Sequence, residues 1–290
     1  MKKIVWLASY PKSGNTWFRA FLANLLRNSD KPVDINELDT GGIASARIPL
    51  DLQLGYDSAN LTHEEIDRLR REYYLRRASE DGATLFLKVH DAHILLNNGL
   101  PLFPPEVSHA VLYFVRNPLD VCVSFAHHSG RADFDRTLVA MGKPNYAVAG
   151  NRGRFHDQLR QRMLSWSGHV RSWADAPGHR VHVMRYEDMK LKTEETFTEA
   201  VRFADLPGGT ERINKAIRFS RFEELRGQEQ KAGFRERVHA DSQFFRKGKI
   251  GSWREELSVE QVEQIVRDHG EVMKRFGYLS ENGNVCSAES

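Results

Sequence analysis

Residues 10–17 read Tyr-Pro-Lys-Ser-Gly-Asn-Thr-Trp and follow a short apolar run. A turn of small residues between a strand and a helix presents backbone N–H groups and the positive end of the helix dipole to an anion. Lys12 adds a positive charge, Ser13 and Thr16 add hydroxyl donors, and Trp17 adds a flat ring that suits a nucleotide base. The segment therefore predicts a site for a phosphate-like group of a nucleotide.

The order of residues in this segment differs from that of the ATP- and GTP-binding loop. That loop reads Gly-x-x-x-x-Gly-Lys-Ser/Thr, with the lysine after the second glycine. Here Lys12 precedes Gly14, and no earlier glycine stands at the required spacing. The segment thus suits a phosphate-like group but not an ordinary nucleoside triphosphate. The plainer alternative is a strand–helix turn that merely contains lysine and serine.

Two further segments carry phosphate-binding residue types. Arg116 follows an apolar run and can bind a phosphate with its guanidinium fork, and Ser124 on the following helical pattern can donate to the same group. From spacing alone, an ion pair between Arg116 and Asp120 is an equal alternative. The stretch Phe245–Gly251 is a short basic loop with two glycines, which taken alone indicates a solvated turn.

Composition and charge limit the class of protein. The chain has 290 residues, 40% hydrophobic and 28% charged, and a net charge of +3, so we expect one sizeable domain and no nucleic-acid partner. Cys122 and Cys286 form neither a disulfide framework nor a metal-binding spacing, which favours a reducing compartment. No apolar run is long enough to span a membrane and no signal peptide is evident, so we expect a cytoplasmic protein without a membrane partner.

Four nearly continuous apolar runs are typical of buried parallel strands; they are Lys3–Ala8, Thr84–His90, Ala110–Arg116 and Arg180–Tyr186. Seven helical patterns lie between and after them: Thr16–Arg27, Thr62–Ala78, Leu119–His128, Phe155–Asp175, Thr193–Ala204, Glu211–Phe219 and Ser258–Phe276. This alternation predicts an α/β fold, a P-loop-like doubly wound parallel sheet of about four to five strands flanked by helices. Ligands of such sheets bind at the carboxyl ends of the strands.

Three stretches lack a regular pattern and are expected to be lids or binding loops; they are Thr40–Asp57, Ser129–Arg154 and Gln228–Gly251. Trp166 and Trp173 share one face of the predicted helix Phe155–Asp175 and are expected in the core.

The three phosphate-type segments together resemble the signatures of the sulfotransferases, enzymes that use 3′-phosphoadenosine 5′-phosphosulfate (PAPS). The match in order and spacing extends from Trp6 to Trp253. This chain has Asn15 where the family usually has Thr, and Ser252 where it often has Asp. The resemblance implies a single sulfotransferase domain over residues 1–280, followed by a polar tail at 281–290.

The resemblance also implies a role for each matching residue. The 5′-phosphosulfate would be held by Lys12, Ser13, Gly14, Asn15 and Thr16; the adenine by Trp17, Tyr186, Ser220 and Phe222; and the 3′-phosphate by Arg116, Ser124, Arg246, Lys247 and Gly248. The segment Leu87–His90 resembles the family's Lys-Thr-His segment, which makes His90 the catalytic base and Lys88, with Lys12, a stabiliser of transferring charge. A structural histidine is the alternative for His90. No metal is required in this family.

The predicted function is transfer of the sulfuryl group of PAPS to a hydroxyl of a small-molecule acceptor, an alcohol or phenol. Apolar and aromatic residues of the irregular stretches favour such an acceptor without excluding a glycan or peptide; they are Tyr56, Phe134, Met141, Tyr146 and Phe234. His93, His127 and His128 are further candidates to line its pocket. The alternatives are a small-molecule kinase that uses ATP and a non-catalytic nucleotide-binding protein. Some relatives dimerise through a C-terminal motif, which is not located in this chain, so a homodimer is left open.

Overall fold

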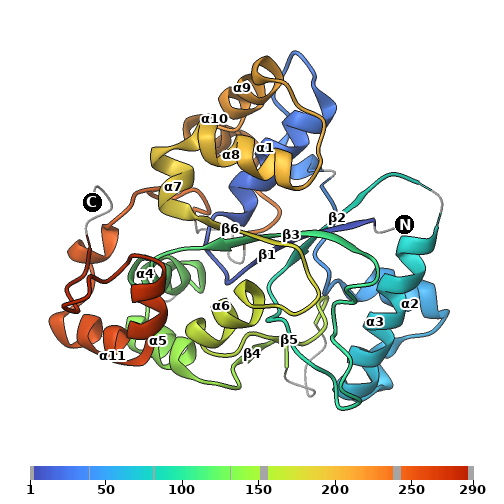
Figure 1. Cartoon of the computed structure of the whole chain (residues 1–290), viewed down its shortest axis with the longest axis horizontal. Coiled ribbons are helices and arrows are strands. Elements are labelled where there is room, and N and C mark those ends of the chain that lie inside the picture. Colours follow the sequence, from blue (N-terminus) through green and yellow to red (C-terminus); the bar gives the residue numbers. More distant parts are fainter. Residues whose placement is uncertain are drawn as a thin grey trace. The chain divides into compact units, whose positions relative to one another are not determined.

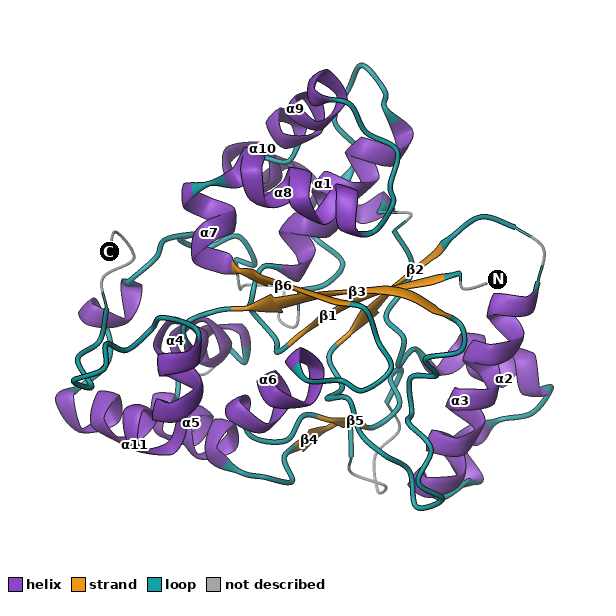
Figure 2. Cartoon of the chain, viewed as in Figure 1, coloured by secondary structure: helices purple, strands orange, loops and turns teal. Residues whose placement is uncertain are grey.

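The computed structural model describes residues 3–38, 40–80, 82–130, 132–150, 156–237 and 243–286. A four-stranded sheet is formed, in the order β2-β1-β3-β6, by β1 (Ile4–Ser9), β2 (Leu85–Val89), β3 (Ser108–Val115) and β6 (Val181–Arg185) (Figure 2). Strands β1 and β2 are parallel, with Ile4 opposite Leu85 and Ala8 opposite Val89. All six residues of β1 are buried, as expected for an interior parallel strand. The predicted α/β sheet and its four strands are confirmed.

The chain divides into two compact units. The first unit comprises Met1–Tyr10, Gly41–Tyr113 and Pro144–Val183, and the second comprises Pro11–Thr40, Phe114–Lys143 and Met184–Ser290. Strands β3 and β6 begin in the first unit and end in the second. Lys12, in the loop after β1, and Arg116, directly after β3, both belong to the second unit.

The described residues of the first unit form four helical segments and a short two-stranded ribbon. The helical segments are α2 (Arg47–Leu54), η2 (Ser58–Asn60), α3 (His63–Ser79) and α6 (Trp166–Ala174), and the antiparallel ribbon pairs β4 (Ala147–Val148) with β5 (Gln161–Arg162) (Figure 1). Helix α3 begins with the predicted capping box between Thr62 and Glu65. Trp166 and Trp173 are fully buried, as predicted.

The second unit is mainly helical. Its elements are α1 (Asn15–Arg27), η1 (Ile35–Glu37), α4 (Pro118–His128), α5 (Phe134–Gly142), α7 (Tyr186–Leu191), α8 (Thr193–Phe203), α9 (Thr210–Phe219), α10 (Phe222–Ala232), η3 (Ser252–Glu255) and α11 (Val259–Arg275). Helix α9 packs against α1 and α8, whereas α4, α5 and α11 pack against one another (Figure 1). These contacts hold α1 and α4, whose first residues include or adjoin predicted phosphate ligands.

The structure corrects several element predictions. The helix predicted over Phe155–Asp175 is wrong in its first part, because α6 starts only after Ser165, whose side chain accepts a hydrogen bond from the N–H of Gly168. The residues before it include β5. The three stretches expected to be irregular contain α2, α5 with β4, and the end of α10. Residues 131, 151–154 and 238–242 of these stretches, residue 155 of the predicted helix and residues 287–290 of the predicted tail lie outside the described residues.

Among the described helices, none combines the length and apolar character needed to cross a lipid bilayer.

Candidate functional site

The residues predicted to bind the cofactor all belong to the second unit. They come from the loop before α1, the junction of β3 with α4, the start of α7, the junction of α9 with α10, and the loop before η3. Lys88 and His90 belong to the first unit.

The loop before α1 has a backbone suited to binding an oxyanion. Lys12 and Gly14 have positive φ angles of 70° and 98°, and a Cβ on Gly14 would lie 2.9 Å from the Tyr186 ring. Helix α1 starts at Asn15 without a capping side chain and without an acidic residue in its first turn, so its first N–H groups have no intrahelical partner. Ser13 is fully buried, and its hydroxyl has no hydrogen-bond partner among the described residues. A buried, unpartnered hydroxyl beside an uncapped helix start fits a phosphate or sulfate group.

Two predicted ligands of the phosphosulfate have partners of their own in this unit. The hydroxyl of Thr16 lies 3.3 Å from a carboxylate oxygen of Glu236, which also forms an ion pair with Arg19. The ammonium nitrogen of Lys12 lies 3.9 Å from the centre of the Phe244 ring, a favourable cation–π distance. A bound oxyanion would therefore compete with Glu236 for Thr16 and with Phe244 for Lys12.

Arg116 joins the loop before α1 to the loop before η3. Its two terminal nitrogens donate to the carbonyl oxygens of Lys12 and Lys249, both at 3.1 Å, and its guanidinium lies 4.2 Å from the centre of the Tyr186 ring. Its Nε is buried and has no hydrogen-bond partner in the described part of the chain. Arg116 therefore retains an unused buried donor, which fits a role in binding an anion.

Asp120 does not pair with Arg116 in the described residues but holds the start of η3. Its carboxylate accepts hydrogen bonds from the N–H of Gly251 at 2.8 Å, the N–H of Trp253 at 3.1 Å and the hydroxyl of Ser252 at 3.1 Å. The alternative of an Arg116–Asp120 ion pair is thus not favoured. Asp120 instead fixes the basic loop that precedes η3.

Arg246 and Lys247, the predicted ligands of the 3′-phosphate, are engaged by carboxylates. Arg246 donates to Glu256 at 3.1 Å, and Lys247 donates to Glu256 and Glu255, both at 2.9 Å. His127 also contacts the Glu256 carboxylate. Burial alone would raise the pKa of Glu256, but the hydrogen bonds from His127, Lys247 and Arg246 outweigh burial and lower the pKa to about 2. Glu256 is therefore ionised at neutral pH and holds Arg246 and Lys247.

An open cavity of about 520 Å³ lies beside two of the predicted adenine contacts, Trp17 and Phe222. The ammonium nitrogen of Lys190 lies 5.6 Å from the Trp17 ring centre and 5.8 Å from that of Phe222. Gly248 has a φ of 59°, and a Cβ there would lie 2.6 Å from the Phe222 ring. The glycine thus allows the basic loop to approach Phe222 closely. Sequence analysis missed Lys190, which no motif marks.

The remaining residues of the second unit that were predicted to contact the cofactor are Ser220, Tyr186 and Ser124, and they differ in burial and in hydrogen bonding. The Ser220 hydroxyl is buried and donates to the carbonyl of Ala216 at 2.9 Å, so only its oxygen lone pairs could serve a ligand. Tyr186 is buried, and burial raises its pKa although the charge of Arg116 opposes the rise. Ser124 is partly buried on α4.

His90, the predicted catalytic base, lies at the end of β2 in the first unit. Its Nδ1 is 2.9 Å from the carbonyl oxygen of Ser9 and 3.4 Å from the Ser9 hydroxyl. Behind it, Nε2 of His169 lies 3.1 Å from the carbonyl oxygen of His90, and Nδ1 of His169 lies 2.9 Å from the Tyr113 hydroxyl. Burial lowers the pKa of His169 to about 3, although its backbone hydrogen bonds oppose the change. Lys88, two residues before His90, is partly buried.

A buried ion pair follows His90 directly, and sequence analysis missed it. Asp91 pairs with Arg70 of α3, at 2.8 Å and 3.2 Å for the two guanidinium nitrogens. Burial alone would lower the pKa of Arg70, but the charges of Asp91, Tyr74 and Asp67 raise it well above its usual value. The only sequence signal was an acidic residue next to a candidate base.

A second buried carboxylate escaped the sequence analysis of the second unit. Glu187 accepts hydrogen bonds from the N–H of Asn117 at 3.1 Å and from the Tyr278 hydroxyl at 3.0 Å. Burial raises the pKa of Glu187 in spite of these bonds. This carboxylate ties the start of α4 to α7, next to Arg116 and Tyr186.

The further candidates for an acceptor pocket are dispersed. His93 is buried against Trp173 and His179 in the first unit, whereas His128 of the second unit contacts the Phe244 ring. Met141 and Phe234, expected to line a pocket, are instead buried in packed cores. Tyr146 lines a separate cavity in the first unit.

Comparison with known proteins identifies the family. A family model described as "Sulfotransferase domain" matches residues 2–277. Human sulfotransferase 1E1 is 24% identical over 276 residues, covering 92% of this chain and 83% of that protein. Cytosolic sulfotransferase 1 of Arabidopsis thaliana is 26% identical over 275 residues, covering 89% and 75%. The rabbit (Oryctolagus cuniculus) amine sulfotransferase is 27% identical over 174 residues, and this match spans 57% of the chain and 55% of that protein.

Solved structures show the same fold. Mouse sulfotransferase SULT7A1, complexed with PAP, aligns with a TM-score of 0.58 and 20% identity over 98% of this chain and 87% of that one. Retinol dehydratase, in complex with androsterone and the inactive cofactor PAP, aligns with a TM-score of 0.62 and 19% identity over 96% and 83%. The chain therefore belongs to the sulfotransferase family. It is an α/β enzyme of the class that transfers a sulfuryl group from PAPS, which decides against the kinase and the non-catalytic alternatives.

Proposed function

We propose that this enzyme transfers the sulfuryl group of PAPS to a hydroxyl of a small-molecule acceptor, with His90 as the general base. The observation that carries this role is the 2.9 Å contact between Nδ1 of His90 and the carbonyl oxygen of Ser9. A carbonyl oxygen only accepts hydrogen bonds, so Nδ1 carries the hydrogen in the neutral imidazole. Nε2 then bears the lone pair, and it is the atom that would take the proton of the acceptor hydroxyl.

The hydrogen bonds behind His90 support a fixed orientation. His169 is neutral because burial lowers its pKa to about 3. Its Nε2–H donates to the His90 carbonyl, so its Nδ1 accepts from the Tyr113 hydroxyl. The backbone and the ring of His90 are thus both held, which a positioned base requires.

The loop before α1 would hold the 5′-phosphosulfate through Ser13, the N–H groups of residues 14–16 and the charge of Lys12. Arg116 would hold the 3′-phosphate with its unused Nε, aided by Ser124, Arg246, Lys247 and Gly248. The cavity beside Trp17 and Phe222 would take the adenine once Lys190 moves aside, with Tyr186 and Ser220 nearby. These roles are supported by the unpartnered buried donors and by the close approach that Gly14 and Gly248 permit.

PAPS, when bound, supplies the sulfuryl group, whose bond to a phosphate oxygen breaks as a bond to the acceptor oxygen forms. Lys12 and Lys88 would stabilise the negative charge that develops on the departing phosphate and on the transferring group. The alternation of side chains along a strand sets Lys88 and His90 on the same side of β2, which supports a shared role.

Two variants test these assignments together. His90→Ala should abolish turnover of PAPS while the affinity for 3′-phosphoadenosine 5′-phosphate (PAP), measured by calorimetric titration with ADP as control, stays close to that of the wild type. Arg116→Ala should instead weaken PAP binding about ten- to one hundred-fold, because a charge-assisted hydrogen bond contributes about 1.5–3 kcal/mol. Normal turnover by His90→Ala would refute the base, and unchanged PAP affinity of Arg116→Ala would refute the phosphate contact.

A cytoplasmic location is part of this proposal, supported by relatives that are named cytosolic sulfotransferases. So are a single sulfotransferase domain over residues 1–280 and the absence of a nucleic-acid partner, the latter supported by a net charge of only +3.

A further inference from the structure

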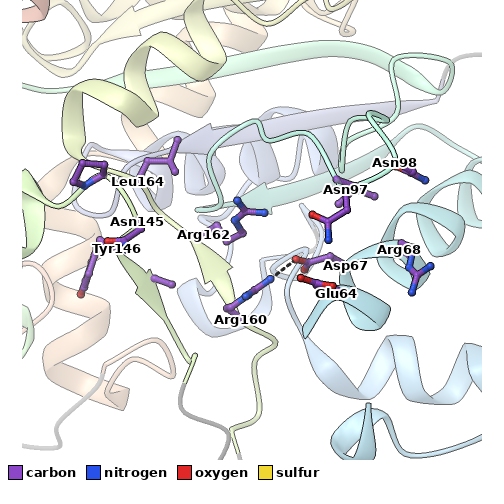
Figure 3. A pocket seen from close by; sticks show the side chains of 13 residues that line it. Glu64, Asp67, Arg68, Asn97, Asn98, Asn145, Tyr146, Arg160, Arg162 and Leu164 are labelled. Carbon is purple, nitrogen blue, oxygen red and sulfur yellow. Dashed lines mark hydrogen bonds and ion pairs between the residues drawn. The ribbon is translucent and has the colours of Figure 1, made fainter. Parts of the chain in front are cut away.

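The first unit contains a cavity of about 600 Å³ that none of the proposed catalytic or cofactor-binding residues lines (Figure 3). It is bordered by α3, by the β4–β5 ribbon and by the loop at residues 96–98. Its size is that of pockets for small organic ligands. Eight of its 13 lining residues carry a charged group or a side-chain amide.

The sequence builds this wall through two simple periodicities. Arg160 and Arg162 are two residues apart at β5, so both side chains are directed to the cavity, while Gln161 between them is buried. On α3, the spacing of three and four residues brings Asp67 and Arg68 onto the face of Glu64. The cavity is thus lined by three guanidinium groups, one from α3 and two from the chain at β5.

Positive charge prevails in this cavity. Asp67 is already paired with Arg160 at 2.6 Å, as Figure 3 shows, and it also contacts Arg70 at 3.5 Å. Among the described residues, the side chains of Arg68 and Arg162 take part in no ion pair, and Nε of Arg160 is buried without a hydrogen-bond partner. Glu64 is the one further carboxylate among the described lining residues.

We propose that this cavity binds an anionic saccharide, with Arg162 and Arg68 on its oxyanion. Guanidinium groups bind carboxylates and sulfate esters with two parallel hydrogen bonds. The amides of Asn97 and Asn145 can donate to and accept from sugar hydroxyls, and the ring of Tyr146 offers an apolar face. A plain phenol would use none of the guanidinium donors and few of the amide groups of the cavity, so the lining favours a ligand that carries both an anion and hydroxyl groups.

The saccharide in this cavity is the acceptor itself, an assignment that rests on the proposed function. The backbone of Arg162 is hydrogen-bonded to the segment that follows His90: the N–H of Ala92 donates to the Arg162 carbonyl at 2.8 Å, and the N–H of Arg162 donates to Asp91 at 3.1 Å. The arginine is therefore anchored two residues from the proposed base. An acceptor held by its charged group at Arg162 would extend one of its hydroxyls toward Nε2 of His90.

Calorimetric titration of the full-length protein tests the site. The probes are a neutral disaccharide, the same disaccharide with a uronic-acid carboxylate, the same disaccharide with a sulfate ester, and sodium sulfate alone. We expect at least one anionic disaccharide to bind about tenfold more tightly than the neutral one, because a charge-assisted hydrogen bond is lost with the neutral probe. The tighter of the two anionic probes identifies the source of the oxyanion.

Three variants test which residues bind the saccharide. Arg162→Ala and Arg68→Ala should each lower the affinity for the anionic disaccharide about tenfold. The control is Arg76→Ala: Arg76 is an exposed residue of α3 that does not line the cavity, so this change should leave the affinity for the disaccharide unchanged. Equal affinity for neutral and anionic disaccharides, sulfate alone binding as tightly as the sulfated disaccharide, or unchanged affinity in Arg162→Ala and Arg68→Ala would overturn the proposal.

Two further measurements distinguish a failure of the acceptor assignment from a failure of the proposed enzymatic function. PAP is titrated into the same samples, and transfer from PAPS to the bound disaccharide is measured with wild-type protein. Saccharide binding without its sulfation, in protein that binds PAP, would overturn the acceptor assignment only. A failure of PAP to bind would instead contradict the proposed function, whatever the saccharide does.

Discussion

The hydroxyl of Ser252 donates to the carboxylate of Asp120 at 3.1 Å, and both side chains are buried. The same carboxylate accepts the N–H groups of Gly251 and Trp253. The family often has an aspartate where Ser252 stands. In this chain the Ser252 hydroxyl satisfies the Asp120 carboxylate, whereas an aspartate at position 252 would place a second carboxylate against it in a buried place.

Replacing Ser252 by Asp should therefore destabilise the protein, by about 2–4 kcal/mol, since a second buried carboxylate would meet the first without a proton or cation between them. Urea unfolding at neutral pH measures the loss. Ser252→Ala, which removes one hydrogen bond only, should cost about 1 kcal/mol. If Ser252→Asp were as stable as the wild type, the Asp120 carboxylate would not be held in the buried, hydrogen-bonded position described above.

Replacing Glu256 by Gln should strengthen PAP binding by about three- to tenfold. The carboxylate competes with a phosphate for Arg246 and Lys247, and its low pKa of about 2 keeps it charged at neutral pH. Glu255→Gln is the matched control, because Glu255 is more exposed and, in the described part of the chain, forms an ion pair with Lys247 and none with Arg246. Weaker PAP binding by Glu256→Gln would mean that the carboxylate positions the two cations and does not compete for them.

Replacing Gly248 by Ala should weaken PAP binding several-fold. Its φ of 59° is strained for alanine, and the new Cβ would lie 2.6 Å from the Phe222 ring. The double variant Gly248→Ala/Phe222→Leu should recover part of the affinity lost by the glycine change, because a smaller side chain relieves the clash. Full affinity in Gly248→Ala alone would show that the loop moves without consequence for the ligand.

Stability should fall as the pH is lowered from 7.5 to 5.5. Burial lowers the pKa of His169 to about 3 and, together with His179, that of His93 to about 4. In the unfolded chain both histidines titrate near the usual pKa of 6.5. Below that pH the unfolded state therefore binds more protons than the folded state and is stabilised relative to it, which lowers the free energy of unfolding. The measurement is the urea midpoint against pH. His169→Gln should flatten the slope, and His63→Gln, which alters a histidine outside this network, should not.

The fold was largely predictable from local pattern. The continuous apolar runs before Ser9 and Arg116 mark buried strands because interior parallel strands are covered on both faces. The run before His90 forms an edge strand that is only partly buried. The helix predicted to begin at Phe155 failed because apolar residues such as Leu159 and Met163 occur at helical spacing, yet the chain around Gln161 pairs with β4. The Ser165 cap was the signal that marked the true start.

Sequence motifs pointed to the candidate cofactor residues and to His90 but not to the groups that hold these residues in place. Glu229 illustrates the reason: its buried carboxylate accepts the N–H groups of Phe244 and Phe245 at 2.7 and 2.9 Å, and no local pattern announces such a pairing across fifteen residues. The Asp91–Arg70 pair and His169 are likewise long-range partners. Their roles arise from burial, which a single sequence does not display.

Arg116 binds the loops at Lys12 and Lys249 through their carbonyl oxygens only. The identity of residue 249 is therefore immaterial to this link, since every amino acid carries the same carbonyl group. The Lys249 side chain is exposed, so a cysteine introduced there would carry a fluorescent reporter beside the candidate nucleotide site while preserving the hydrogen bond that closes it. The chain thus offers a point of attachment for an optical sensor of ligand binding.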